Sequence, residues 1–267
     1  MNKIFKDISP VLFIGALLIS SFIFAQDNVE EITVDSVTII GTKDDVKDLA
    51  GSGAVISNED LQKAMDTDIQ KILTAVPGVY MRTEEGYGLR PNISIRGTAI
   101  ERSGKITIME DGILVAPAPY TASSAYYFPT TARIHSVEVL KGPSAVPLGP
   151  QSIGGAINLI STPIPKVNSG KFIQEFGENN MTRTHAYYGV NQGNFGALVE
   201  VHEHASDGFD SIANVGGDTG FDKSDLMIKA RYSSGNHSVT FKRVDIEENS
   251  DQSYVGLSQA SFNANPR

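Results

Sequence analysis

The sequence predicts an α+β domain followed by about five antiparallel strands. Helix signals are confined to residues 57–77, and short apolar segments separated by turn residues follow over residues 79–161. Beyond Val167 the chain alternates apolar and polar residues in longer segments, and no helix signal interrupts them. Helices and short strands that are followed by a run of alternating strands favour an α+β domain joined to an antiparallel sheet.

Acidic side chains outnumber basic ones by 31 to 22 in this chain of 267 residues, so the formal net charge is −9. Such a chain lacks the cationic surface that favours nucleic-acid binding, and we expect no nucleic-acid partner. The chain also has no cysteine. This excludes a cysteine nucleophile, a cysteine-ligated zinc site and a cysteine-ligated iron–sulfur cluster.

The first 25 residues have the layout of a cleavable secretory signal. Lys3 and Lys6 precede an uncharged apolar run of 15 residues from Val11 to Ala25, and acidic polar sequence follows at once. This run is shorter than the roughly 20 residues that a membrane-spanning helix needs. We therefore predict a signal peptide at residues 1–25, and export through the inner membrane.

Residues 26–48 are polar and acidic, with one β-prone patch between Ile32 and Ile40. Apolar residues at positions 32, 34, 37, 39 and 40 indicate an extended conformation, which Gly41 ends. Two interpretations stay open from the residues alone. The patch is either the first strand of the domain or an extended peptide that adds to the sheet edge of another protein.

Two short helices are predicted at the start of the domain. Ser57 and Asp60 have the spacing of a capping box, with Asp in the usual place of Glu. Asp66 or Thr67 is the expected cap of the second helix, which the Pro77-Gly78 dipeptide ends. This helix is expected to bury one apolar face, made of Ile69, Ile72, Leu73 and Val76.

Short strands separated by turn residues are predicted for the rest of the domain, at Ile93–Arg96, Ile106–Met109, Ser136–Leu140 and Ala156–Ile160. Asp111-Gly112 follows the second of these segments, and this dipeptide is typical of a tight hairpin turn. The strands from Thr184 onward place apolar residues on one face and polar residues on the other. That pattern fits the start of a transmembrane β-barrel and also a soluble antiparallel sheet.

Glu200, His202 and His204 share the polar face of one predicted strand. Histidines at this spacing can bind a metal ion, but polar residues on the inner face of a sheet explain the pattern as well. We therefore predict no metal site. Ser144 and Ser152 have no histidine partner that the sequence identifies, so we expect neither a nucleophile–base pair nor any enzyme activity.

Five motifs occur in order along the domain: Val76-Pro-Gly-Val79, Ile93-Ser-Ile-Arg-Gly97, Met109-Glu-Asp-Gly112, Val137-Glu-Val-Leu-Lys-Gly-Pro143 and Gly154-Gly-Ala-Ile-Asn-Leu-Ile160. Together they resemble the plug domain of TonB-dependent outer-membrane receptors, in that family's order and spacing. Two further segments, Ala116-Pro-Ala-Pro-Tyr120 and Gly149-Pro-Gln-Ser-Ile-Gly-Gly155, resemble the ferric dicitrate receptor branch of this family.

The resemblance implies the fold class and the domain boundaries. It implies an α+β plug domain, with a mixed sheet and short helices, at residues 49–165. The first five or so antiparallel strands of a transmembrane β-barrel, surrounded by outer-membrane lipid, are implied for residues 166–267. Residues 26–48 then form a flexible segment that carries the TonB box, which consists of Ile32, Thr33, Val34, Asp35, Ser36 and Val37.

The resemblance also implies a mechanism and partners. TonB, energised by ExbB and ExbD, is expected to pair with the TonB box and to pull on the plug, which opens a path through the barrel. In the family, two basic plug residues pair with acids of the barrel wall and lock the plug, and they match Arg96 and Lys141 here. Lys141 stands where the family commonly has arginine, so it can pair but cannot form the planar bidentate fork.

Two plug loops touch the substrate in this family. Matched by motif, their residues here are Arg82, Tyr87, Arg90 and Asn92 in the first loop, and Pro119, Tyr120 and Thr121 in the second. The arginines suit the carboxylates of an anion that resembles ferric citrate. The expected function is import of a ferric chelate, either ferric citrate or another carboxylate-type siderophore, and no cofactor is expected.

Two alternatives remain open. The first is a TonB-dependent receptor for another cargo, such as a different siderophore, cobalamin or an oligosaccharide. The second is a secreted, non-transporting binding protein that uses the plug fold alone. The five strands are too few to close a barrel, and the chain ends at Arg267 without a terminal aromatic residue. We therefore expect a truncated chain, the front part of a longer receptor.

Overall fold

The structure is a computed structural model that describes residues 38–64, 68–83, 87–115, 127–149, 151–212, 216–251 and 258–265. All of them belong to one compact unit, Val34–Arg267. The predicted signal peptide and TonB box lie outside the described residues, as do Pro119, Tyr120 and Thr121. No helix in the described part of the chain is both long and apolar enough to cross a membrane.

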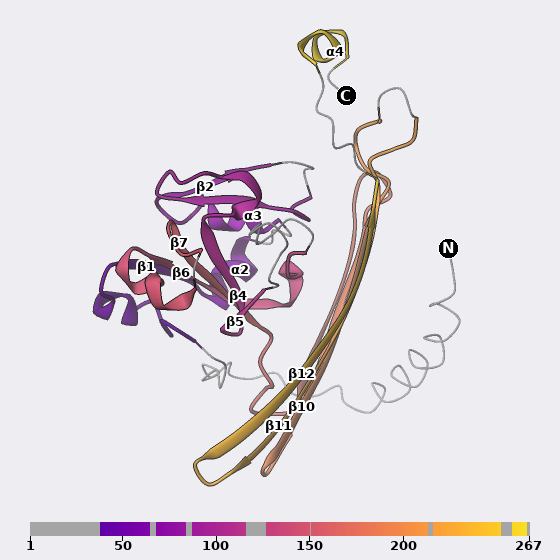
Figure 1. Cartoon of the computed structure of the whole chain (residues 1–267). Helices are drawn as coiled ribbons and strands as arrows, with labels where there is room; N and C mark the ends of the chain where they lie inside the picture. Colours follow the sequence, from indigo (N-terminus) through magenta and orange to yellow (C-terminus); the bar gives the residue numbers. More distant parts are fainter. Residues whose placement is uncertain are drawn as a thin grey trace, which may run out of the picture. The chain divides into compact units, whose positions relative to one another are not determined.

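A five-stranded mixed sheet forms the centre of the N-terminal domain, by which we mean residues 38–165 (Figure 1). Its strand order is β1-β6-β7-β4-β5, and only β4 and β7 run parallel. The bounds of the strands are β1 Ser52–Ile56, β4 Ile106–Glu110, β5 Ile113–Leu114, β6 Ile134–Lys141 and β7 Gly155–Ser161. The mixed sheet predicted for this domain is confirmed.

Short helices and one further hairpin surround the sheet. The hairpin pairs β2 with β3 in an antiparallel manner. The elements are η1 Asp45–Asp48, α2 Asn58–Ala64, α3 Ile69–Leu73, β2 Val79–Arg82, β3 Asn92–Ile95, η2 Glu101–Ser103, η4 Thr131–Arg133 and η5 Pro143–Leu148.

Local sequence rules account for where these helices begin. Before α2, the Asp60 carboxylate accepts a hydrogen bond from the Ser57 amide at 2.8 Å, and Ser57 Oγ accepts one from the Asp60 amide at 3.3 Å. This confirms the predicted capping box. The prediction for α3 was wrong, because its cap is Asp68, which accepts from the amide of Gln70 at 2.8 Å. Asp68 is a good acceptor adjacent to the first helical residue, so it takes the place expected of Asp66 or Thr67.

The apolar core of the domain lies between α3 and the strands. Its buried members include the predicted α3 face and inward residues of β3, β4, β6 and β7, namely Ile69, Ile72, Leu73, Val76, Ile93, Ile95, Ile106, Ile108, Val137, Val139, Ile157 and Leu159. Asp111 and Gly112 join β4 to β5 with φ of 50° and 75°. Two residues with positive φ match the twist of a tight hairpin, so the predicted Asp-Gly turn is confirmed.

Five long strands follow the domain and form an antiparallel sheet in the order β12-β11-β10-β9-β8, which we call the five-strand sheet (Figure 1). Their bounds are β8 Ser169–Phe176, β9 Thr182–Gln192, β10 Phe195–Ser206, β11 Phe221–Ser234 and β12 His237–Ser250. Along β11 the alternation of buried and exposed side chains begins at Phe221. A short helix, α4 Gln259–Ala264, comes last.

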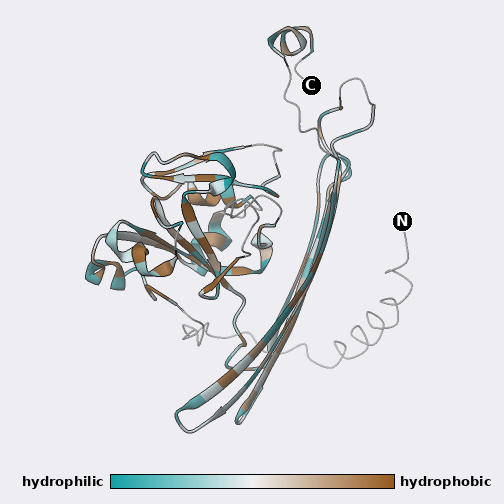
Figure 2. Cartoon of the chain, viewed as in Figure 1, coloured by the Kyte–Doolittle hydropathy of each residue, from teal (hydrophilic) through white to brown (hydrophobic). Residues whose placement is uncertain are grey.

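The two faces of this sheet differ in chemistry, and Figure 2 shows the alternation of apolar and polar residues along its strands. One face exposes large apolar side chains, among them Phe172, Tyr188, Phe195, Tyr232 and Phe241. Its rings include Phe195 and Tyr232, whose centroids are 4.8 Å apart. The opposite face buries polar side chains, among them Glu200, His202, Lys223, Asp225 and Lys229. The predicted arrangement, apolar outward and polar inward, is confirmed.

Candidate functional site

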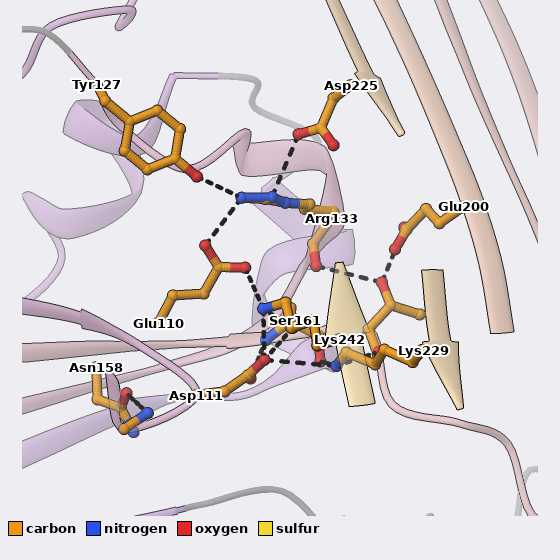
Figure 3. Close-up of polar contacts among 12 residues, drawn as sticks. Glu110, Asp111, Tyr127, Arg133, Asn158, Ser161, Glu200, Asp225, Lys229 and Lys242 are labelled. Carbon is orange, nitrogen blue, oxygen red and sulfur yellow. Dashed lines mark hydrogen bonds and ion pairs between the residues drawn. The ribbon is translucent and has the colours of Figure 1, made fainter. Parts of the chain in front are cut away.

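A buried arginine joins the N-terminal domain to the five-strand sheet (Figure 3). Arg133 ends η4 and is 1% exposed. Its Nη2 donates to Glu110 Oε2 at 2.8 Å and to Tyr127 Oη at 2.9 Å, while Nη1 donates to Asp225 Oδ2 on β11 at 3.2 Å. Burial lowers the pKa of Arg133, but Glu110 and Asp225 outweigh burial and raise this pKa above its ordinary value. The guanidinium therefore stays charged, and its fork spans two carboxylates.

Two lysines of the sheet meet the turn that follows β4. Lys242 Nζ on β12 donates to Glu110 Oε1 at 2.5 Å, to Asp111 Oδ2 at 2.6 Å and to Ser161 Oγ at 3.0 Å. Lys229 Nζ on β11 lies 3.5 Å from Asp111 Oδ2. Burial raises the pKa of Asp111, but Lys229 and Lys242 hold this pKa below its ordinary value. Asp111 is therefore ionised at neutral pH.

We call these six side chains the charge cluster; it consists of Glu110, Asp111, Arg133, Asp225, Lys229 and Lys242. The cluster holds three cations and three anions, so its formal charges cancel. Each charge has an opposite partner, which limits the desolvation penalty of burying it. The contact of domain and sheet is thus built from compensated charges.

The backbone that enters the sheet adds further polar links. Lys229 Nζ donates to the carbonyl of Thr162 at 2.8 Å, and Thr162 Oγ1 donates to Glu200 Oε1 at 2.9 Å. Glu200 Oε1 also lies 2.7 Å from His185 Nε2. Within the described ranges, no group of three or more histidine and acidic side chains is arranged to hold a metal ion. The hydrogen bonds of Thr162 to Lys229 and Glu200 fix the connection between β7 and β8 to the inner face of the sheet.

The structure brings two predicted substrate-binding residues to the sheet. Tyr87 Oη lies 3.1 Å from Ser206 Oγ on β10, and its ring centroid is 4.6 Å from that of Phe221. Arg90 Nη1 forms an ion pair with Glu248 Oε1 on β12 at 2.6 Å. Both side chains are thus engaged in the same contact between domain and sheet.

The other described residues of the predicted substrate-binding set, Arg82 and Asn92, make their contacts within the domain. Arg82 is exposed and forms an ion pair with Glu101 at 3.2 Å. Asn92 is buried, and its Oδ1 accepts from the amide of Arg102 at 2.8 Å. The exposed guanidinium of Arg82 is accessible to an anion, whereas Asn92 joins the start of β3 to η2. The substrate-binding roles of all these residues stay predictions.

The two predicted lock residues contact atoms of their own domain. Arg96 is exposed, has φ of 57°, and donates from Nη2 to Ser52 Oγ at 3.2 Å. Lys141 Nζ donates to the carbonyl of Pro77 at 2.9 Å, and burial lowers the pKa of this lysine. Their pairing with barrel acids stays a prediction. The ion pairs that the structure does place between domain and sheet involve Arg90, the charge cluster and Glu248.

Sequence reasoning missed the charge cluster as a site. Glu110 and Asp111 belong to the motif Met109-Glu-Asp-Gly112, which predicted a turn and contributed to the family resemblance but indicated no charged contact. Asp225 and Lys229 lie two strand periods apart, on one polar face. The two adjacent acids at the Asp-Gly turn, Glu110 and Asp111, were therefore an available signal for a charged contact. Arg133 had no such signal, because nothing in its local sequence distinguishes it from a surface residue.

Comparison with known proteins follows the same division of the chain. Residues 45–156 match the family described as TonB-dependent Receptor Plug Domain. The iron-regulated outer membrane virulence protein of Vibrio cholerae serotype O1, strain Classical Ogawa 395, is 32% identical over 151 residues, which cover 54% of this chain and 22% of the relative. The same protein from the El Tor Inaba N16961 strain matches equally well.

Two solved structures share the fold over most of this chain. The ferric citrate transporter FecA in its unliganded form has a TM-score of 0.67 at 24% identity, over 88% of this chain and 36% of that one. The siderophore receptor PirA from Acinetobacter baumannii has a TM-score of 0.59 at 19% identity, over 78% of this chain and 33% of that one. This chain thus spans about a fifth of the length of the Vibrio relatives and about a third of these structures. The matches confirm the predicted resemblance to TonB-dependent receptors, the fold class and the outer-membrane location.

Proposed function

We propose that the protein acts in TonB-dependent import of a ferric chelate across the outer membrane, with the N-terminal domain as the plug that gates the path. The plug-domain match over residues 45–156 supports this role for the domain. The two faces of the five-strand sheet suit a wall with lipid on one side and a polar lumen on the other. The proposal gives this chain no catalytic step.

The charge cluster is the observation that carries the gating role. A plug must stay in place at rest and must still be movable. Separating an apolar contact costs about 25 cal/mol for each Å² that is exposed to water. Ionised side chains regain hydration when they separate, and this offsets much of the lost attraction. A contact made mainly of compensated charges therefore holds the domain with a smaller cost of release than an apolar contact of equal area.

The apolar part of the contact is small, which supports the same conclusion. One buried apolar cluster of three residues joins Ile164, which precedes β8, to Leu198 on β10 and Met227 on β11, with Tyr187 and Val244 partly buried against it. The large core of the domain is made of the domain's own residues. Movement of the domain against the sheet therefore leaves that core intact.

We further propose that the cargo is ferric citrate or another carboxylate-type siderophore. The relative in Vibrio cholerae is named as iron-regulated, and FecA is a ferric citrate transporter. The exposed guanidinium of Arg82 offers a charged donor for a carboxylate. TonB, energised by ExbB and ExbD, is the proposed partner of residues 32–37, and the segment that follows them is bound to the domain.

Uptake of radioactive iron tests this proposal. Cells that express the protein receive ⁵⁵Fe as ferric citrate or as a catecholate chelate, with and without TonB. We expect uptake of ferric citrate that disappears without TonB. Val34→Pro blocks strand addition by the TonB box and is expected to abolish uptake, whereas Asn28→Pro, outside the box, is the matched control.

Other outcomes would redirect or overturn the proposal. Uptake of the catecholate alone would keep the receptor and replace the cargo. A soluble periplasmic product whose ligand binding does not depend on TonB would overturn the transport function. That result would favour a secreted binding protein built on the plug fold.

A further inference from the structure

The first described residues are bound to the domain by one buried carboxylate. We call residues 38–41 the N-terminal arm, and they directly follow the predicted TonB box. Glu138 Oε2 accepts from the amide of Ile39 at 2.9 Å, and Glu138 Oε1 accepts from the amides of Ile40 and Gly41 at 2.9 and 2.8 Å. Three consecutive backbone donors thus converge on a single side chain.

Glu138 is buried, so its carboxylate depends on the hydrogen bonds that the arm donates. Glu138 lies on β6, inside the mixed sheet, and it is 1% exposed. Among the described side chains, Asn158 on β7 also donates to Glu138, from Nδ2 to Oε2 at 2.8 Å. A buried carboxylate is costly unless it is hydrogen-bonded. Withdrawal of the arm therefore leaves Glu138 with too few donors, and the site has to rearrange.

Asn158 carries this connection across the sheet to the hairpin turn. Its Oδ1 accepts from the amide of Gly112 at 2.9 Å. The adjacent residue, Asp111, binds Ser161 through both of its carboxylate oxygens and binds Lys242 of β12 at 2.6 Å. Figure 3 shows Asn158 beside this turn and Asp111 pointing to Lys242. One continuous series of hydrogen bonds thus leads from the arm to the charge cluster.

We propose that Glu138 and Asn158 couple the N-terminal arm to the Asp111–Lys242 contact, so that displacement of the arm loosens the N-terminal domain from the five-strand sheet. Loss of the arm leaves Glu138 without its backbone donors, and Asn158 then turns toward Glu138 and leaves Gly112. The turn that holds Asp111 loses this hydrogen bond and is freer to separate from Lys242. The source of the displacement, a pull by TonB, rests on the proposed function, but the coupling itself does not.

Coupling of this kind is reciprocal, and this provides the test. The chain has no cysteine, so Thr38→Cys gives a single attachment point for a spin label on the exposed start of the arm. The mobility of the label is measured by electron paramagnetic resonance on the protein in detergent, without TonB or cargo. Glu138→Gln removes the charge that holds the arm, and Glu59→Gln changes an exposed glutamate as the control.

A second pair of variants changes β12, at the other end of this series of hydrogen bonds. Lys242→Gln removes the contact to Asp111, whereas Arg243→Gln changes the next residue on β12, which is exposed and pairs with Asp245. Coupling free energies between sites are typically about 1–3 kcal/mol, which corresponds to at least about a fivefold change in an equilibrium. We expect Glu138→Gln and Lys242→Gln each to raise the ratio of mobile to immobile label by about fivefold or more.

The outcomes separate this inference from the proposed function. A label in Lys242→Gln that is as immobile as in the parent would overturn the coupling, even if Glu138→Gln fails to fold. An unchanged label in Glu138→Gln would show that this carboxylate does not hold the arm, which also overturns it. Failure of the uptake experiment with a positive label result would refute the transport function and leave the coupling in place.

Discussion

Removal of the Asp225 charge is expected to weaken the contact between the N-terminal domain and the five-strand sheet. The side chains of Arg133 and Asp225 are 1% and 2% exposed, and their atoms approach to 3.2 Å. Asp225→Asn keeps the volume of the side chain and removes its charge. The buried guanidinium then loses one of its two carboxylate partners, while Glu110 remains 2.8 Å from Nη2.

The magnitude follows from this partial loss. Breaking a buried ion pair by removing one partner costs about 3–5 kcal/mol. We expect the low end of that range, about 3 kcal/mol, because Glu110 still compensates part of the charge of Arg133. With a urea slope of about 1–3 kcal/mol per M, the unfolding midpoint of the domain falls by about 1–3 M.

Pulse proteolysis of the purified protein in detergent, at rising urea concentration, measures this midpoint. Asp222→Asn is the matched control, because Asp222 is exposed on the other face of β11. The double variant Arg133→Met with Asp225→Leu removes both charges and is expected to recover most of the loss. If Asp225→Asn unfolds at the same urea concentration as Asp222→Asn, the buried pair does not stabilise the contact and the reasoning fails.

Three further changes test smaller parts of the structure. Burial raises the pKa of Asp111, but Lys229 and Lys242 hold this pKa below its ordinary value. The ionised carboxylate therefore stabilises the folded protein above about pH 4, and this stabilisation is lost as the pH falls through the lowered pKa. The midpoint difference between the parent and Asp111→Asn, measured by the same proteolysis, should therefore be constant near pH 7 and should narrow only as the pH falls below about 4. Gly112→Ala places a side chain at φ 75° and should cost about 1–2 kcal/mol in urea unfolding; an unchanged midpoint would contradict the turn geometry. Ser57→Ala removes one half of the capping box and should cost about 1 kcal/mol, whereas the exposed Ser234→Ala should cost nothing measurable.

The features that the sequence predicted correctly are those set by neighbouring residues. The Asp111-Gly112 dipeptide tolerates positive φ at both positions, so its turn follows from two residues alone. The strand alternation in β11 likewise depends on the period of two residues, which places Asp225 and Lys229 on one face. Neither feature requires knowledge of any distant part of the chain.

The pairing of charges depends on such distant parts and could not be predicted. Arg133 and Asp225 are separated by 92 positions, and Glu110 and Lys242 by 132. Each residue alone has the sequence environment of an exposed charge. Only the order of the strands and the register of β12 against β11 decide that Lys242 points to the domain.

The turn at Glu110-Asp111-Gly112 combines both kinds of information. Its backbone shape comes from the local Asp-Gly rule, and the same shape directs the Asp111 carboxylate to Lys242 and the Gly112 amide to Asn158. A turn of this type needs no packing against the apolar core to keep its conformation, because two backbone φ values define it. This hairpin end therefore takes part both in the hydrogen bonds that lead to the arm and in the contacts to the sheet. Release of this hairpin end from the sheet breaks its contacts to Lys229 and Lys242, and the core built around Ile93 and Ile157 stays folded.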